Sequence, residues 1–195
     1  MYGTNWRRNL SVASLCFFVV SFFGWGYETL TCYVAYGHYC DRGFLSLPFC
    51  PIYGAPVCLF ILLAGTPKQG VFVRLTELLP LRGNLADGWK RAFAYVGYFL
   101  FSSLFVTGIE YAVGAYFRSR GVKLWGYARY PANYKGLICL PVSLLWGLLF
   151  TLFATFVWRP LYKLLYKIPK PLAFCINATL WVSLTFDFCL RFFAL

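Results

Sequence analysis

The chain has 195 residues, of which 61% are hydrophobic and only 12% are charged, and its formal net charge is +12. A soluble domain usually has about 25% charged residues, so a water-soluble globular fold is excluded. The charged residues cluster between long apolar stretches, which indicates an integral membrane protein. Because the basic residues flank those stretches, the positive charge favours membrane lipids as partners and gives no support to nucleic-acid binding.

Five apolar stretches are long enough to cross a bilayer, whose roughly 30 Å hydrocarbon core takes about 20 helical residues. They are, in chain order, Leu10–Tyr36, Gly43–Thr66, Ala92–Phe117, Gly136–Trp158 and about Leu172–Leu190. The first is expected to be a retained span, because no small-residue cleavage site follows it. The sequence therefore predicts an all-α, polytopic membrane helix bundle of five transmembrane helices, forming a single integral membrane domain over residues 1–195.

The second stretch contains three prolines, which are expected to break or kink its helix: Pro48, Pro51 and Pro56. Backbone groups freed in this way are tolerated at membrane depth only where they face protein or a cavity. In the loop that follows, the apolar segment Val71–Leu81 is expected to lie along the membrane surface as a short amphipathic helix.

The distribution of basic residues predicts the orientation of the chain. With the N-terminus inside, the inner segments hold eleven Lys and Arg residues and the outer segments hold seven. This bias follows the positive-inside rule without being steep. Seven outer basic residues therefore require either a functional role that outweighs the rule or the opposite orientation. Five spans from an inner N-terminus place the C-terminus outside.

The eight cysteines show no CxxC spacing, so a zinc or redox site has no support, and no metal or other cofactor is expected. Most of them fall within the apolar stretches, where cysteine behaves as a small apolar residue. Cys40 and Cys50 fall near one membrane face, and a disulfide between them is an option if that face is extracytoplasmic.

An internal repeat relates the second and fourth stretches. Arg42-GFLSLPFCPIY-Gly54 aligns without a gap to Lys135-GLICLPVSLLW-Gly147 at an offset of 93 residues. The helix before each copy carries one glutamate, Glu28 in the first and Glu110 in the second. We interpret this pattern as a duplicated two-helix unit, and chance similarity between apolar sequences is the alternative. The units are repeat 1 at about residues 10–66, repeat 2 at about 92–158, and a fifth helix at about 172–190.

Three carboxylates fall within the predicted spans, where an uncompensated charge costs a few kcal/mol or more. Glu28, Glu110 and Asp187 all fall in the outer parts of helices that run from inside to outside. Arg42 and Lys135 begin the next helices at the same face, so the two glutamates are positioned to meet them. Such pairing reduces the desolvation cost of both charges.

These charges have two interpretations. In one, they lock helix packing and register, as Asp187 does if it pairs with Arg191 four residues later. In the other, they line a polar, outward-facing site for a charged or headgroup-bearing ligand. The predicted substrate-binding residues are Glu28, Arg42, Glu110, Asn133 and Lys135, with Tyr53, Trp125, Tyr127 and Asp187 as additional members. The aromatic residues among them also suit an ordinary membrane-interface belt.

Motifs of common enzymes are absent from the sequence. No GxxxxGK[ST] phosphate loop, GxSxG elbow or HExxH zinc motif occurs. The single histidine, His38, falls in a loop between two predicted spans and is expected to be a surface residue. The chain is therefore not expected to be an enzyme, and ATP hydrolysis by a phosphate loop would need a separate subunit.

Several of these residues resemble the motifs of a bacterial family of ABC transporter permeases, type IV. The first half of the family pattern appears here as Glu28, Arg42-GFL and Cys50-PIY-Gly54. The second half appears as Thr107-GIE-Tyr111, Trp125-Gly-Tyr127 and Asn133-YKGLI-Cys139, followed by Trp146-Gly147. The combination covers most of the chain and is specific, although each piece alone is weak. One departure is Gly126, which stands where the family pattern has an aspartate.

The resemblance implies a multi-pass protein of the bacterial cell membrane with a transport-related function and a separate ATPase subunit as a partner. If the family aspartate serves a ligand or a proton, Gly126 implies an altered activity. Two other functions stay open: a non-transporting membrane scaffold or regulatory subunit, and an intramembrane enzyme that acts on a lipid-linked substrate with Glu28 or Glu110 as its base. Membrane lipids are expected partners in every case, and a homo-oligomer is a further option.

Overall fold

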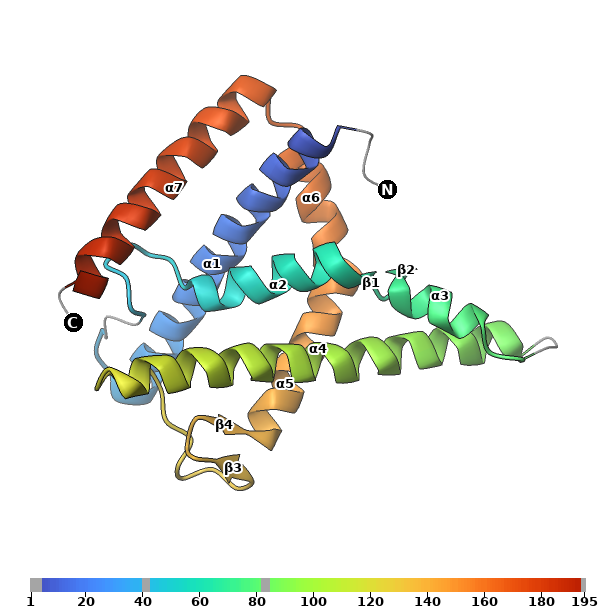
Figure 1. The fold of residues 1–195 in the computed structure, drawn as a ribbon, viewed down its shortest axis with the longest axis horizontal. Coiled ribbons are helices and arrows are strands. Elements are labelled where there is room, and N and C mark those ends of the chain that lie inside the picture. Colours follow the sequence, from blue (N-terminus) through green and yellow to red (C-terminus); the bar gives the residue numbers. More distant parts are fainter. Residues whose placement is uncertain (1–4, 40–42, 82–84, 194–195) are drawn as a thin grey trace. The chain divides into compact units, whose positions relative to one another are not determined.

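The computed structural model describes residues 5–39, 43–81 and 85–193. Within these ranges the chain is helical apart from two short antiparallel hairpins (Figure 1). The helices are α1 (Trp6–Tyr36), α2 (Pro51–Ala64), α3 (Val71–Glu77), α4 (Ala86–Ser119), α5 (Leu140–Leu152), the π-helical segment η1 (Phe153–Val157), α6 (Trp158–Tyr166) and α7 (Lys170–Phe193). The hairpins pair β1 (Gly65–Thr66) with β2 (Gln69–Gly70), and β3 (Asn133–Tyr134) with β4 (Ile138–Cys139).

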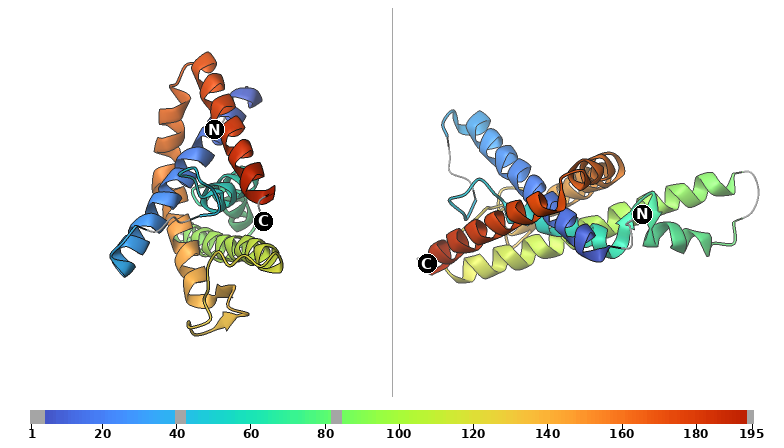
Figure 2. Two further views of the ribbon diagram at one scale, coloured as in Figure 1. Left: turned by 90° about the vertical axis from the view of Figure 1, so that its left-hand side faces the viewer. Right: turned by 90° about the horizontal axis from the view of Figure 1, so that it is seen from above.

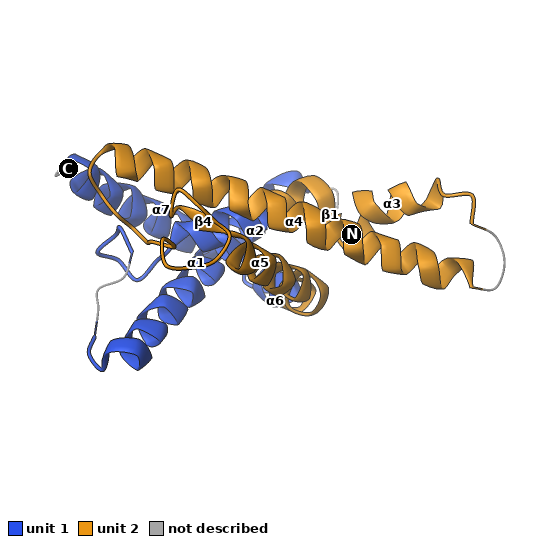
Figure 3. Cartoon of the chain, turned by 90° about the horizontal axis from the view of Figure 1, so that it is seen from below, with its two compact units in different colours: residues 1–58, 161–195 blue, residues 59–160 orange. Residues whose placement is uncertain are grey.

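The chain divides into two compact units, each described here by itself (Figure 3). Unit 1 comprises residues 1–58 and 161–195, which contain α1, the start of α2, most of α6 and α7. Unit 2 comprises residues 59–160, which contain the end of α2, both hairpins, α3, α4, α5 and η1. One predicted two-helix repeat therefore contributes mainly to unit 1, and the other lies in unit 2.

Four helical segments in the described ranges are long enough and apolar enough to cross a membrane: Trp6–Tyr36, Ala86–Ser119, Leu140–Tyr166 and Lys170–Phe193. They correspond to the first, third, fourth and fifth predicted spans, and the predicted all-helical class is confirmed. The predicted second span, Gly43–Thr66, differs, because only Pro51–Ala64 is helical and its 14 residues are about 21 Å long. The predicted count of five full-length helices therefore becomes four long helices and one short apolar helix.

Prolines explain why α2 is short. Proline has no backbone N–H and disfavours helical geometry in the residue before it. The residues that precede a proline therefore rarely belong to the same helix. Pro51 instead begins α2, where the first turn needs no N–H donor, and the helix then continues through Pro56. The preceding stretch, residues 43–50, is non-helical.

In unit 1, α1 and α7 pack side by side and run in the same direction (Figure 2). The Asn177 Nδ2 donates to the Ser11 carbonyl oxygen at 3.1 Å, and one turn later the Trp181 Nε1 donates to Ser14 Oγ at 2.7 Å. The Trp181 ring also stacks on Phe17 with the ring centroids 5.2 Å apart. This alignment is the one predicted for the first and fifth spans, which both run from inside to outside.

The beginning of α1 is fixed against the end of α6. Asn5 caps α1 by accepting the Arg8 N–H at 3.2 Å, and Gly37 ends the helix in the left-handed region with φ at 71°. The Arg8 guanidinium, only 7% exposed, donates to the carbonyl oxygens of Tyr166 and Ile168. A cation at the carboxyl end of α6 also complements the helix dipole.

In unit 2, an aromatic core holds α3 and α5 against α4. The Phe60 ring lies 5.2 Å from Tyr98 and 5.3 Å from Phe150, measured between centroids, and Phe72 of α3 lies 5.5 Å from Tyr98. The Tyr98 hydroxyl donates to the Gly65 carbonyl oxygen at 3.2 Å, which satisfies its polar end. Helix α3 confirms the predicted helix in Val71–Leu81, over the first seven residues of that segment.

Candidate functional site

Glu28 of α1 meets Tyr53 of α2 within unit 1. The Tyr53 hydroxyl donates a hydrogen bond to Glu28 Oε1. Gly24, one helical turn before Glu28, makes this contact accessible, because a Cβ at Gly24 would collide with the Tyr53 ring. The tyrosine ring therefore crosses α1 at a glycine, and its hydroxyl reaches the next turn. Glu28 is half-buried in this position.

The next residue of α2, Gly54, sets the crossing of the two helices. A Cβ at Gly54 would collide with Ser21 Oγ and with the Phe17 carbonyl oxygen, so only glycine lets α2 approach α1 so closely. Ser21 is fully buried and precedes Glu28 by seven residues, which is two helical turns. Ser21 and Glu28 therefore lie on the same face of α1, toward α2.

Glu110 of α4 meets Tyr127 within unit 2. The Tyr127 hydroxyl donates to Glu110 Oε1 at 2.7 Å, and the Glu110 side chain is only 7% exposed. Tyr127 lies in the loop between α4 and α5, residues 120–139, rather than on a helix. Each glutamate of the predicted repeat thus receives a hydrogen bond from a tyrosine, and we call the two contacts the carboxylate–phenol pairs.

The α4–α5 loop folds over the carboxyl-terminal part of α4. Trp125 packs on Gly114, where an added Cβ would lie 3.0 Å from the indole ring, and its Nε1 donates to the Leu137 carbonyl oxygen at 2.8 Å. The Tyr127 N–H donates to the Gly136 carbonyl oxygen at 2.9 Å. These contacts place Trp125 and Tyr127 over successive turns of α4, with Tyr127 at Glu110.

The helix crossing in unit 2 has the same composition as the one in unit 1. A Cβ at Gly147 of α5 would collide with the Ser103 side chain of α4. Ser103 is buried and precedes Glu110 by seven residues, as Ser21 precedes Glu28. In both units, therefore, a glycine of the shorter helix packs against a serine two turns before the glutamate.

Asn133 and Lys135 shape the α4–α5 loop. The Asn133 side chain donates to the Tyr130 carbonyl oxygen at 2.8 Å and accepts the Gly136 N–H at 3.1 Å. Lys135 has φ at 53°, its carbonyl oxygen accepts from Arg118 at 2.6 Å, and its ammonium group lies 5.3 Å from the centre of the Tyr134 ring. Both side chains are exposed, and their contacts are with the loop itself.

Asp187 of α7 holds the non-helical stretch that precedes α2. Its Oδ2 accepts the backbone N–H groups of Ser46 at 2.8 Å and Leu47 at 2.9 Å. Arg191 donates through Nε to Ser46 Oγ at 2.8 Å, so it joins this contact through the serine instead of through the predicted pairing with Asp187. Arg42, which was predicted to belong to the site, lies outside the described residues.

The sequence interpretation missed the serine–glycine contacts and the role of Ser46. The common spacing of Ser21 from Glu28 and of Ser103 from Glu110 was the available signal. It also left Cys32 unassigned, although this residue near the carboxyl end of α1 is disulfide-bonded. Cys50, by contrast, is a free thiol, so the suggested disulfide between Cys40 and Cys50 is wrong, and Cys40 lies outside the described residues.

Comparison with known proteins gives one match. The family described as Putative ABC-transporter type IV matches residues 15–192, which include both carboxylate–phenol pairs and Asp187. No curated protein and no solved structure matches the chain. The family match covers nearly the whole length and agrees with the four long apolar helices in indicating a membrane protein with a transport-related function. The chain belongs to the Putative ABC-transporter type IV family.

Proposed function

We propose that this chain is a multi-pass membrane subunit of a transport system and that each of its carboxylate–phenol pairs takes part in binding substrate. The observation that carries this proposal is Glu110, a carboxylate only 7% exposed on a long apolar helix, which is hydrogen-bonded to Tyr127 of the adjacent loop. An ionisable side chain at such a position is costly and by default marks a ligand or ion pathway.

The recurrent helix crossing supports a duplicated origin for the two pairs. Gly54 against Ser21 and Gly147 against Ser103 are equivalent contacts, and each serine lies two turns before a glutamate. Chance similarity of apolar sequence does not require that the two aligned glycines, Gly54 and Gly147, make matching contacts. A duplicated unit would give each copy its own carboxylate–phenol pair, near the outer face of the bacterial cell membrane.

The chemistry of the pairs limits the ligand class. A carboxylate accepts hydrogen bonds and favours cations, and the neighbouring phenol can donate or accept. We therefore propose that each pair takes a ligand with an ammonium or another hydrogen-bond-donating group, with its own glutamate, Glu28 or Glu110, as the direct contact. Arg42 would add positive charge for an acidic part of a ligand at the first pair, and Lys135 would do so at the second. Asn133 would act by stabilising the conformation of the loop that carries Tyr127.

The disulfide of Cys32 supports the proposed orientation. Disulfides persist in oxidising compartments and are rare in the cytosol. Cys32 lies near the carboxyl end of α1, so this end is expected outside and the N-terminus inside. Glu28 lies one turn before Cys32 on the same helix, which places its pair near the outer face.

The test compares conservative variants by mass spectrometry of the small molecules that co-purify with the membrane-extracted protein. Tyr127→Phe and Glu110→Gln should each lose a co-purifying molecule that the wild type retains, while the thermal unfolding temperature stays near that of the wild type. Tyr130→Phe is the matched control, because Tyr130 lies in the same loop and is 52% exposed. Folded variants that keep every wild-type ligand would show that the pairs only support packing.

A second candidate function is a non-transporting scaffold or regulatory subunit. It is favoured by Asp187, whose carboxylate is engaged by two backbone N–H groups and so acts in packing. The two functions differ in their coupling to an ATPase subunit. Ligand-stimulated ATP hydrolysis by a co-purified complex would support transport, whereas a stable complex whose hydrolysis rate does not respond to ligand would support the scaffold.

A further inference from the structure

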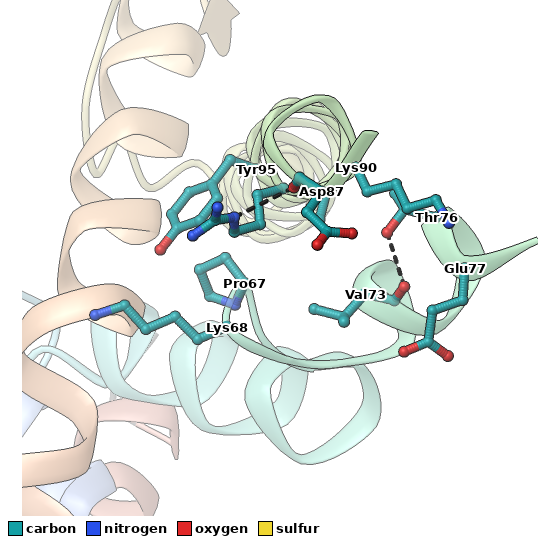
Figure 4. Close-up of a pocket in the computed structure, with 10 residues that line it drawn as sticks. Pro67, Lys68, Val73, Thr76, Glu77, Asp87, Lys90 and Tyr95 are labelled. Carbon is teal, nitrogen blue, oxygen red and sulfur yellow. Dashed lines mark hydrogen bonds between the residues drawn. The ribbon is translucent and has the colours of Figure 1, made fainter. Parts of the chain in front are cut away.

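A cavity of about 820 Å³ lies between α3 and α4 in unit 2, and neither Glu110 nor Tyr127 of that unit lines it. Its walls come from the turn between β1 and β2, from α3 and from the first turns of α4 (Figure 4). The volume is within the range of small-molecule sites. The charged residues that line it are Lys68, Glu77, Asp87, Lys90 and Arg91. The cavity therefore carries both signs of charge on opposing walls.

Two of the basic residues are partly engaged by the protein. The Lys68 ammonium donates to the Thr155 carbonyl oxygen at 3.2 Å and lies 5.2 Å from the centre of the Phe156 ring. Figure 4 shows the Lys68 side chain directed away from Asp87. Arg91 uses only its Nε to reach the Asp87 carbonyl oxygen, at 3.2 Å, so its two terminal nitrogens stay available to a ligand.

The other three charges have no bonding partner within the described parts of the chain. No hydrogen bond or ion pair there involves the Glu77 carboxylate, the Asp87 carboxylate or the Lys90 ammonium group. Figure 4 shows the Asp87 carboxylate projecting from α4 toward Pro67 and Val73. Opposite charges are therefore held around one cavity without neutralising each other directly.

Exposed apolar side chains lie next in sequence to the residues that line the cavity. Leu75 in α3 and Leu78 at its end are 52% and 79% exposed, and Leu85 and Trp89 at the start of α4 are 78% and 59% exposed. Tryptophan and apolar side chains beside basic residues are typical of the boundary between headgroups and acyl chains in a bilayer. A ligand with a charged head and an apolar tail would suit a charged cavity whose helices also expose such apolar side chains.

We propose that this cavity binds the headgroup of an aminophospholipid of the phosphatidylethanolamine type. Lys90 and Arg91 would contact the phosphate, and Asp87 and Glu77 would accept hydrogen bonds from the primary ammonium group. A purely anionic lipid would meet two uncompensated carboxylates. Phosphatidylcholine has a quaternary ammonium group with no N–H to donate, so it would satisfy the carboxylates less well. The inference does not depend on the proposed transport function.

The experiment uses native mass spectrometry of the full chain released from nanodiscs that contain equimolar phosphatidylethanolamine and phosphatidylcholine. The wild type should retain the ethanolamine lipid in excess. Asp87→Asn should reduce this preference by roughly threefold, the scale of one partly exposed ion pair, and Asp87→Glu should restore it. Lys90→Gln should reduce retention of both lipids, because both carry the phosphate.

Arg74→Gln is the matched control, since Arg74 is an exposed basic residue of α3 that does not line the cavity. Soluble glycerophosphoethanolamine, added as a competitor, separates the two sources of the headgroup. Displacement of the lipid only at great excess supports a lipid ligand, whereas displacement at equal concentration would show that the site binds the free headgroup instead. Equal retention of both lipids by the wild type, or an unchanged preference in Asp87→Asn, would overturn the proposal.

Discussion

The Asp187 carboxylate on α7 accepts the backbone N–H of Leu47, with 2.9 Å between Oδ2 and the nitrogen. The same oxygen accepts the N–H of Ser46. Further along the stretch, the Phe49 N–H donates to the Leu47 carbonyl oxygen at 2.7 Å and the Cys50 N–H donates to the Ser21 carbonyl oxygen at 3.0 Å. These N–H groups belong to the stretch that prolines keep out of α2. A charged acceptor thus replaces the helical hydrogen bonds that this stretch lacks, and the hydrogen bonds in turn lower the cost of burying the charge.

Removing this acceptor should destabilise unit 1. We expect Asp187→Ala to lower the free energy of unfolding by about 1–3 kcal/mol, because two partly buried hydrogen bonds to a charged acceptor are lost. Asp187→Asn should cost less, since its amide oxygen still accepts. Thermal unfolding of the detergent-purified protein measures both, with Thr185→Ala as the control, because Thr185 is an exposed residue of the same helix. Equal unfolding temperatures for wild type and Asp187→Ala would contradict this role.

The contact between Gly147 and Ser103 leads to a second prediction, with a specific rescue. Gly147→Ala should destabilise the protein by about 1–3 kcal/mol, the usual cost of overpacking. The obstructing atoms belong mainly to the Ser103 side chain, so adding Ser103→Gly should recover much of the loss. Thermal unfolding of the two single variants and the double variant gives the coupling between the sites. Purely additive effects would argue against this contact.

The corresponding change in unit 1 should not be rescued in the same way. A Cβ at Gly54 would meet the Phe17 carbonyl oxygen as well as Ser21 Oγ, and truncating Ser21 leaves the backbone oxygen in place. Gly108→Ala is the control for both experiments, because nothing lies within 4 Å of a Cβ at Gly108 in α4. At that position alanine should stabilise the helix by up to about 1 kcal/mol.

The long helices could be predicted from the sequence because their cause is local. An uninterrupted apolar run specifies a membrane-length helix, and a glycine after the run ends it, as Gly37 ends α1 at the predicted residue Tyr36. The length of α2 was mispredicted by counting apolar residues without stopping at Pro51. The proline was visible, but the alternative partners for the freed N–H groups were not, because Asp187 is 141 residues from Ser46.

The two glutamates were predicted from the cost of a buried charge, and their partners were only partly predicted. Tyr53 was predicted as an additional member of the site, and its hydroxyl does donate to Glu28. Tyr127 reaches Glu110 from an irregular loop, whose path depends on residues in the left-handed region such as Lys135. No periodic pattern in the sequence encodes such a path. The sequence alone therefore could not distinguish Tyr127 as a site residue from an ordinary aromatic residue of the membrane interface.

Gly126 offers a test of the departure from the family pattern. It lies beside a cavity of about 50 Å³ that Lys123 and Arg118 also line, and a Cβ there would lie 3.0 Å from the Lys123 ammonium nitrogen. Because that nitrogen is the far end of a flexible side chain, Gly126→Asp should be accommodated with an ion pair worth up to about 1 kcal/mol. The thermal unfolding temperature should rise, less so at high salt, and Gly126→Asn should show no gain. A drop in stability would mean that the cavity does not admit a carboxylate.

The disulfide of Cys32 makes the orientation testable at positions outside the helices. Alkaline phosphatase is active only where its own disulfides form, so its activity reports an extracytoplasmic position. With the N-terminus inside, phosphatase inserted after Arg120, beyond the end of α4, should be active, and phosphatase inserted after Leu79, beyond the end of α3, should be inactive. The reverse pattern would place the seven basic residues counted as outer in the cytoplasm. It would also put the eleven basic residues counted as inner outside, against the positive-inside rule, and leave the disulfide of Cys32 in a reducing compartment, so the two insertions test the charge distribution and the thiol chemistry together.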